Sequence, residues 1–257
     1  MSHHVNTNKR KPKVVASIEA RMSSSRFPGK MLADLNGQPA LTRLIRRLRQ
    51  CRTLDDIILA TSVEAADDAL EDWAKKEGVK CYRGSEDDVL LRVVETQQTA
   101  GGEVVVEITG DCILTDPDVV DIGVNTFLAN NCDMVTNCER FSFPPGLYVQ
   151  VFRLADLEEV EEKIDDPAVR EHVSLYFYEH PERYRIIHLM ASPRWLLPQD
   201  CRLYLDYPED LQFLKEIYRR LESRYGEAFG AQEIVNLLHK EPELMEINRY
   251  CENKPVR

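Results

Sequence analysis

The sequence contains no run of about 20 apolar residues, the length that a helix needs to cross a bilayer. Residues 1–13 are polar and basic and include no apolar core of a secretory signal. The 7 cysteines are scattered without CxxC spacing, which argues against a disulfide framework and against a zinc site. We therefore expect a cytoplasmic protein with reduced thiols and no membrane partner.

The sequence also lacks an excess of basic residues. Its 33 Lys and Arg residues stand against 44 Asp and Glu residues, so the net charge is −11. A nucleic-acid partner is not expected, because binding by counterion release needs a large basic surface. At 43% hydrophobic and 30% charged residues, the composition is that of an ordinary globular protein.

Short apolar runs alternate with amphipathic windows along most of the chain. Residues 1–12 show no periodicity and are predicted to be a disordered tail, and residues 13–257 are predicted to form one domain. The first half is expected to contain strands at 14–18, 57–60, 79–82, 104–108 and 133–136 and helices at 41–48, 65–76, 87–99 and 117–129. This alternation predicts an α/β fold, a mostly parallel Rossmann-like sheet with helices on both faces.

The second half follows the pattern less regularly. A small insertion is expected there, with strands at 147–152, 184–189 and 203–205 and helices at 155–163, 169–179 and 208–225.

The segment after the first expected strand, residues 19–30, reads EARMSSSRFPGK and is rich in cations and hydroxyls. It contains neither GxGxxG nor a P-loop motif. Ligands of such sheets sit beyond the carboxyl ends of the strands, and Arg and Lys side chains bind phosphate oxygens. The loop is therefore either a polyphosphate site or a solvated basic loop, and we expect the Lys30 charge to be exposed.

Two aspartates follow expected strands. Asp111 comes after the strand 104–108 across Thr109-Gly110, and Asp206 comes directly after the strand 203–205. Two carboxylates that converge from different strand ends can hold Mg²⁺, which also takes phosphate oxygens and water as ligands. Alternatively, Asp206 caps the helix that begins near Pro208, because Asp is a preferred N-cap residue.

Five motifs together resemble a known family. They are ARMSSSRFPGKML from residue 20, YRGSEDDVL from 82, ITGDC from 108, REHV from 170 and LDYPEDL from 205. In this order and spacing they resemble the cytidylyltransferases that activate acidic sugars, the 3-deoxy-manno-octulosonate and acylneuraminate enzymes. The branch that they resemble most is the one of spore-coat-polysaccharide cytidylyltransferases, over about residues 13–220.

The resemblance implies a fold of the nucleotide-diphospho-sugar transferase type and a homodimer. It implies transfer of CMP from CTP to an acidic sugar or similar anionic acceptor for a surface polysaccharide, with Mg²⁺ as cofactor and pyrophosphate as product. The roles that it implies are catalysis for Arg21, Lys30 and Asp111; Mg²⁺ binding for Asp111 and Asp206; nucleotide binding for Ala20, Arg21, Ser24, Arg26, Lys30, Thr61, Arg83 and Thr109; and acceptor binding for Arg170 and His172.

The chain departs from this family where acidic residues usually precede the central strand. Pro145, Tyr148 and Gln150 stand in their places, and Leu91 replaces an Asp before Arg92. These losses favour an acceptor that is more anionic than usual.

Two other functions are considered. A nucleotide-sugar-dependent glycosyltransferase would carry a DxD motif, where this chain has Gly110-Asp111-Cys112, and it would have no use for a triphosphate loop. A non-catalytic regulatory protein that binds nucleotides would not need Arg21, Lys30, Asp111 and Asp206 together.

Overall fold

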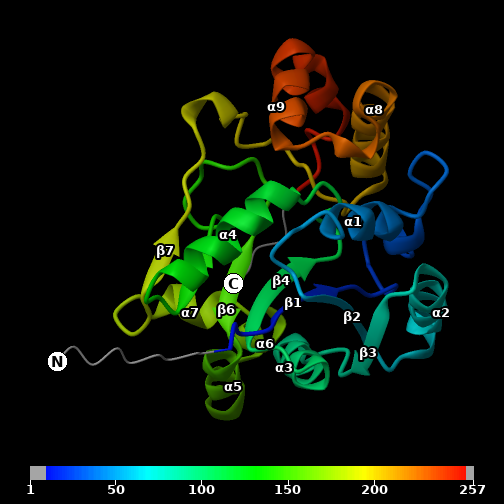
Figure 1. Ribbon diagram of the computed structural model, residues 1–257. Coiled ribbons are helices and arrows are strands. Elements are labelled where there is room, and N and C mark those ends of the chain that lie inside the picture. Colours follow the sequence, from blue (N-terminus) through cyan, green and yellow to red (C-terminus); the bar gives the residue numbers. More distant parts are fainter. Residues whose placement is uncertain (1–9, 253–257) are drawn as a thin grey trace.

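The protein is described by a computed structural model for residues 10–252, so residues 1–9 of the expected tail lie outside the described part (Figure 1). Seven strands form one sheet in the order β3-β2-β1-β4-β6-β5-β7. Their bounds are β1 Val14–Glu19, β2 Asp56–Ser62, β3 Lys80–Gly84, β4 Val104–Thr109, β5 Met134–Thr136, β6 Gln150–Arg153 and β7 Ile186–His188.

The sheet is mostly parallel. Strands β1 to β4 run in the same direction, β6 runs antiparallel to both β4 and β5, and β7 pairs parallel with β5. The prediction of a mostly parallel Rossmann-like sheet is therefore confirmed. The register places Glu19 opposite Thr109, so the carboxyl ends of β1 and β4 meet at one edge. A ligand site is expected at such an edge.

Helices cover both faces of the sheet. They are α1 Ala40–Leu48, α2 Asp68–Glu77, α3 Val89–Ala100, α4 Pro117–Ala129, α5 Leu154–Lys163, α6 Pro167–Glu171, α7 Leu175–Glu179, α8 Pro208–Tyr225 and α9 Ala231–Lys240. Short 3₁₀ helices span Lys30–Leu32, Ala65–Asp67, Pro193–Trp195, Gly226–Ala228 and Pro242–Ile247. Among residues 10–252, none of the helices has the length and apolar content to cross a membrane.

Alternating residues of the central strands explain the layers. In β4, Val104, Val106 and Ile108 pack into the core that includes α1, α4, α8 and α9. Val105, between them, packs into the second core with α3, α5, α6 and α7. Successive side chains of a strand point to opposite faces, so both faces of this apolar strand are covered. Figure 1 shows α8 and α9 together at the end of the molecule opposite α5.

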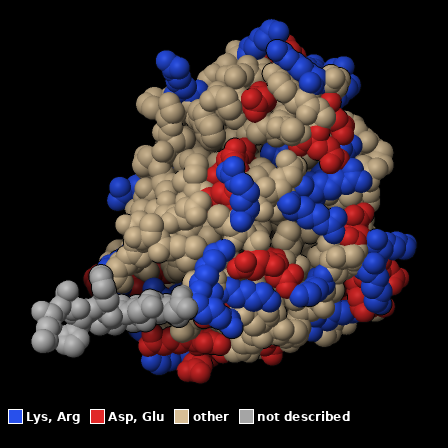
Figure 2. All heavy atoms as spheres, viewed as in Figure 1, with Lys and Arg blue, Asp and Glu red and all other residues tan. Residues whose placement is uncertain are grey.

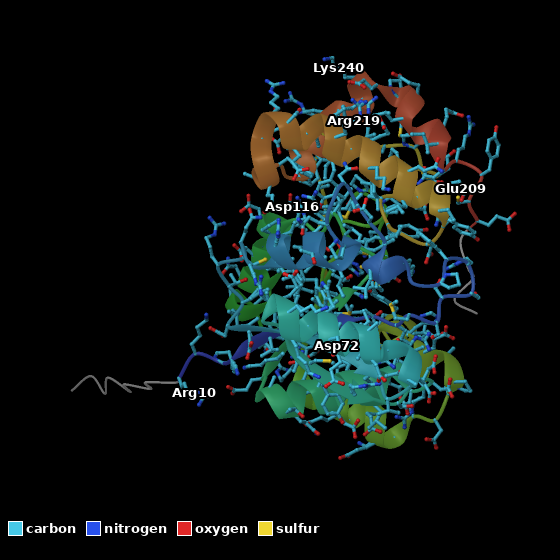
Figure 3. The ribbon with its side chains drawn as sticks, turned by 90° about the vertical axis from the view of Figure 1, so that its right-hand side faces the viewer. Arg10, Asp72, Asp116, Glu209, Arg219 and Lys240 are labelled. Atoms are coloured by element: carbon cyan, nitrogen blue, oxygen red, sulfur yellow. The ribbon has the colours of Figure 1, made fainter. Side chains whose placement is uncertain are left out.

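Two buried arginines of α1 connect this helix to the C-terminal part of the chain. Arg43 donates to Glu222 of α8 at 2.5 Å, and Arg47 donates to the carbonyl oxygen of Phe229 at 2.9 Å. Asp116, at the start of α4, accepts from the backbone N–H of Ala231 in α9. Figure 3 accordingly shows Asp116 below α8 and α9.

The second half differs from the expected elements in three places. The helix expected at 169–179 is split into α6 and α7, because His172 ends the first of them in an extended conformation. Residues 203–205 form no strand; the N–H of Leu203 bonds to Pro145 O and that of Leu205 to Asp111 O, so each contacts a loop instead of a neighbouring strand. Helix α9 was not predicted.

Candidate active site

A cavity of about 570 Å³ opens at the carboxyl edge of β1 and β4. Its wall is built from the end of β1 and the loop after it, the start of α3, the end of β4, the end of α6 and the segment before α8. On the face that Figure 2 shows, acidic and basic side chains are interspersed rather than separated. Residues of the cationic loop 19–30 line this cavity together with Asp111 and Asp206, the two carboxylates that follow the expected strands.

The loop after β1 is folded back by a turn at Gly29. Gly29 has φ 77°, a left-handed conformation that glycine adopts without strain, and its N–H donates to Met22 O at 3.0 Å. The N–H of Met22 donates to Asp67 Oδ1 at 2.7 Å, which fixes the other end of the loop. Lys30 follows the turn and is only 7% exposed. The expectation that Lys30 is an exposed charge is therefore wrong, because the turn directs its side chain into the protein.

Lys30 joins the two aspartates. Its Nζ lies 2.6 Å from Asp206 Oδ1 and 3.1 Å from Asp111 Oδ2. Arg26 Nη2 contacts the other oxygen of Asp206 at 2.7 Å. Burial lowers the pKa of Lys30, but the two carboxylates outweigh burial and the net shift of this pKa is upward. Lys30 is therefore a cation held between two anions.

Asp206 is not a helix cap. The N-cap residue of α8 is Tyr207, and Asp210 Oδ2 accepts from the N–H of Tyr207 and from that of Asp206, both at 2.9 Å. The carboxylate of Asp206 instead points to Lys30 and Arg26. Asp210 is in turn held by the buried Arg202. The capping interpretation is wrong, and Asp206 is available to the cavity.

Asp111 is positioned by the glycine before it. The N–H of Gly110 donates to Glu19 O at 2.8 Å, and a Cβ on Gly110 would lie 2.7 Å from that same oxygen. A side chain at this position would therefore separate β1 from the end of β4. The close approach brings Asp111 beside the loop that starts after Glu19.

Most residues predicted for the site line this cavity. They are Ala20, Arg21, Ser24, Arg26, Lys30, Thr109, Asp111, His172 and Asp206. Arg21 Nη1 donates to Glu86 O at 3.0 Å, which holds the guanidinium against the segment before α3. Ser24 Oγ accepts from the N–H of Phe27 at 3.3 Å. Their contacts with ligands remain predictions.

Three predicted residues lie away from the cavity. Thr61 is buried within β2. Arg83 points toward α2, where it contacts Asp68 at 2.6 Å and Glu71 at 2.9 Å. Arg170 pairs with Asp88 at 3.2 Å and with Glu161 at 2.9 Å. Arg83 and Arg170 thus connect secondary-structure elements.

The charged residues beside the cavity that were not predicted include Glu171 and three residues of β1, β4 and α3. Of these three, Glu19 and Arg92 line the cavity, and Glu107 is buried on β4, near enough to Glu19 to raise the pKa of Glu19. Each is the charged residue of an otherwise apolar or uncharged segment, VVASIE, VLLRVV or VVVEIT, and this break in the apolar pattern is the sequence signal that could have found them.

Gln150, one of the departures from the family pattern, has a partner in Glu107. Its Nε2 donates to Glu107 Oε2 at 3.0 Å, and its Oε1 accepts from the hydroxyl of Tyr178 at 2.7 Å. An acid at position 150 would instead place a second carboxylate against Glu107. The amide at position 150 therefore supplies a hydrogen-bond donor to the buried Glu107.

A Rossmann-like sheet with a cationic loop and two carboxylates at its carboxyl edge defines the nucleotidyltransferase class of α/β proteins. The chain belongs to the cytidylyltransferase family, whose sequence profile matches residues 15–246.

Individual relatives agree with this assignment. The chain is 32% identical to the spore coat polysaccharide biosynthesis protein SpsF of Bacillus subtilis, over 88% of this chain and 94% of SpsF. It is 28% identical to a 3-deoxy-manno-octulosonate cytidylyltransferase of Chlorobium phaeovibrioides, over 83% of this chain and 87% of the relative. The structure of a cytidylyltransferase from Leptospira borgpetersenii superposes with a TM-score of 0.86 at 28% identity, covering 95% of this chain and 100% of the other. The resemblance read from the motifs is therefore confirmed.

Proposed function

We propose that the protein is a Mg²⁺-dependent cytidylyltransferase that transfers CMP from CTP to an acidic sugar or similar anionic acceptor. In this reaction an acceptor hydroxyl oxygen bonds to the α-phosphorus of CTP. The bond from that phosphorus to the oxygen bridging to the β-phosphorus breaks, pyrophosphate leaves, and the hydroxyl proton is released. The SpsF and octulosonate relatives favour an acidic sugar destined for a surface polysaccharide.

One observation carries the proposal. Lys30 Nζ lies within 3.1 Å of both Asp111 and Asp206, so the cationic loop and the two carboxylates share one point in the cavity. A nucleoside triphosphate bound there meets cations for its phosphates and carboxylates for a metal ion at the same time. A site for a neutral ligand would need neither set of charges.

The two carboxylates fit a metal ion that arrives with phosphate. Among residues 10–252, no group of three or more His, Cys, Asp or Glu side chains is placed to hold a metal by itself. Asp111 and Asp206 would supply two ligands, and phosphate oxygens and water the remainder, which is the ligand set that Mg²⁺ prefers. Bound there, Mg²⁺ neutralises phosphate charge and polarises the α-phosphate.

The side chains of this chain have two tasks. Arg21, Arg26 and Lys30 compensate the charge that develops on the departing pyrophosphate, and they are already held near the cavity by Glu86 and Asp206. His172, at the end of α6, lines the cavity and contacts the acceptor. Such a transfer depends on positioning and charge compensation rather than on covalent catalysis.

The reaction is tested by measuring pyrophosphate release with Mg²⁺, each of the four nucleoside triphosphates and a panel of acidic sugars. We expect release with CTP and one class of acid, and none from Asp111→Asn. In the absence of acceptor, CTP with Mg²⁺ should raise the melting temperature more than GTP or UTP does, because a ligand of the native state stabilises it. Pyrophosphate release that Asp111→Asn leaves intact, or a larger shift with GTP, would contradict the proposal.

A further inference from the structure

The segment before α8 places Asp206 relative to Asp111. The N–H of Leu205 donates to Asp111 O at 2.9 Å, so this segment is bonded to the backbone of the other aspartate. Next along the chain, the N–H groups of Asp206 and Tyr207 both donate to Asp210 Oδ2 at 2.9 Å. The separation of the two carboxylates therefore depends on how firmly Asp210 holds this segment.

A buried set of polar side chains fixes Asp210. The Asp210 side chain is fully buried, and Arg202, which is 3% exposed, donates to both of its oxygens at 3.3 and 3.1 Å. Asn248 is 1% exposed, and its Nδ2 donates to Asp210 Oδ1 at 2.8 Å and to Arg202 O at 3.0 Å. We call Arg202, Asp210 and Asn248 the anchor cluster.

The anchor cluster has more contacts than a helix cap requires. A cap satisfies free N–H groups of the first turn, and one carboxylate is enough for that. Here a buried cation and a buried amide also converge on the carboxylate, and burying such groups is costly unless each is paired. Arg202 additionally donates to the Tyr204 hydroxyl at 2.8 Å, and Tyr204 lines the cavity. The cluster therefore holds two residues of the cavity wall, Tyr204 and Asp206.

Asn248 connects the cluster to a distant part of the chain. It follows the 3₁₀ helix Pro242–Ile247, which packs against α8 and α9, and it lies 46 residues from Arg202 along the chain. It stands outside the five motifs and outside residues 15–246, which the family's profile matches. Replacing Asn248 removes two hydrogen bonds from the cluster and changes no residue that is predicted to contact a ligand.

We propose that Asn248 is a positioning residue which, through the anchor cluster, keeps Asp206 in place for Mg²⁺. This inference rests on the proposed function. Mg²⁺ demands near-ideal octahedral geometry, so a carboxylate that moves binds it poorly. Residues that support a metal ligand contribute about 10–100-fold to metal affinity. When Arg26 and Lys30 turn from Asp206 to the phosphates, the cluster keeps this carboxylate at its place in the cavity.

The test measures the affinity for CTP by calorimetry, once with excess Mg²⁺ and once with EDTA. The ratio of the two affinities is the gain that the metal ion gives. We expect Asn248→Ala to lower this gain by at least about fivefold and to leave the affinity in EDTA unchanged, because the phosphate loop is untouched. In pyrophosphate release, the Mg²⁺ concentration for half-maximal rate should rise, whereas the rate at saturating Mg²⁺ should stay close to that of the wild type.

Leu244→Ala is the matched control. Leu244 lies in the same 3₁₀ helix and is buried in the core, so its truncation loosens this segment without removing a hydrogen bond from the cluster. Both variants should melt below the wild type, but only Asn248→Ala should lose the metal gain. If the alanine variant at position 248 does not fold, Asn248→Ser, which keeps one hydroxyl donor, gives the same comparison with a smaller loss.

Three results would overturn the inference. An unchanged metal gain in Asn248→Ala removes Asn248 from metal positioning and leaves the proposed function standing. An equal loss of the gain in Leu244→Ala assigns the effect to loosening of the C-terminal part of the chain. Wild-type protein that binds no CTP, or binds it equally with Mg²⁺ and with EDTA, refutes the proposed function and the inference together.

Discussion

Replacing Lys30 by Met tests whether the buried ammonium is a structural counter-ion of the two aspartates. Met retains an unbranched apolar stem of similar length and removes the charge. Removing one partner of a buried ion pair costs about 3–5 kcal/mol. Here Asp206 keeps Arg26 at 2.7 Å, and the Asp111 side chain is 25% exposed to water. We therefore expect a smaller loss, about 2 kcal/mol of unfolding free energy.

The assay is thermal unfolding followed by circular dichroism. In a protein of this size a loss of about 2 kcal/mol lowers the melting temperature by about 4–8 °C. Millimolar Mg²⁺ without nucleotide should restore much of this loss in Lys30→Met and should shift the wild type less, because a divalent ion can replace the missing cation only in the variant.

Lys163→Met is the matched control. Lys163 pairs with Glu159 on the exposed face of α5, and its side chain is 58% exposed. Surface ion pairs contribute little, so this variant should melt within about 1 °C of the wild type. Equal melting temperatures for Lys30→Met and Lys163→Met, or a Lys30→Met protein that does not respond to Mg²⁺, would refute the counter-ion reasoning.

Three further predictions follow from the contacts of the site. Asp111→Asn and Asp206→Asn should each lower the rate of pyrophosphate release by orders of magnitude. The double variant should lose little more activity than either single variant, because residues that act on one ion work as a unit. Additive losses would argue against a shared ion. Burial raises the pKa of Glu107 to about 8 in the native state, whereas an unfolded chain has a Glu pKa of about 4.3. Between about pH 4.3 and pH 8 the native state therefore binds a proton that the unfolded state has lost, so the free energy of unfolding should fall as pH rises through this range. Glu107→Gln should flatten this slope in urea unfolding at about pH 5 and about pH 8, and an unchanged slope would contradict the burial of a protonated Glu107. Arg83→Ala should cost about 1 kcal/mol of stability through its lost ion pairs with α2 and leave CTP affinity unchanged in calorimetry, whereas a loss of affinity would place Arg83 in the site.

The sequence alone was sufficient for the regular part of the fold. The strands around Val14–Glu19 and Val104–Thr109 and the helix Pro117–Ala129 were predicted within one or two residues. Their signals are local: an apolar run for a strand covered on both faces, and a Pro near the start of a helix. The family motifs are local in the same sense, because each is a short stretch of consecutive residues.

Segments whose backbone or side-chain partners are distant in the sequence were not predicted correctly from local patterns. Residues 203–205 are apolar like a strand, but their backbone bonds go to loops at Pro145 and Asp111. The arginines 83 and 170 stand in motifs, yet their side chains turn to acidic groups of α2 and α5. Composition shows that such partners exist, but which of many carboxylates a guanidinium contacts depends on how the elements pack.

The site itself was decided by tertiary structure. Lys30 lies 81 residues from Asp111 and 176 from Asp206 along the chain, and the sheet brings their charges together at one edge. The sequence identified these three residue types and their loops. The burial of Lys30 results from the turn at Gly29. The Asp206 carboxylate does not cap α8, because Asp210 accepts the hydrogen bonds at the start of that helix. Charge placement follows from packing, because a buried ion is stable only where the fold supplies its partner.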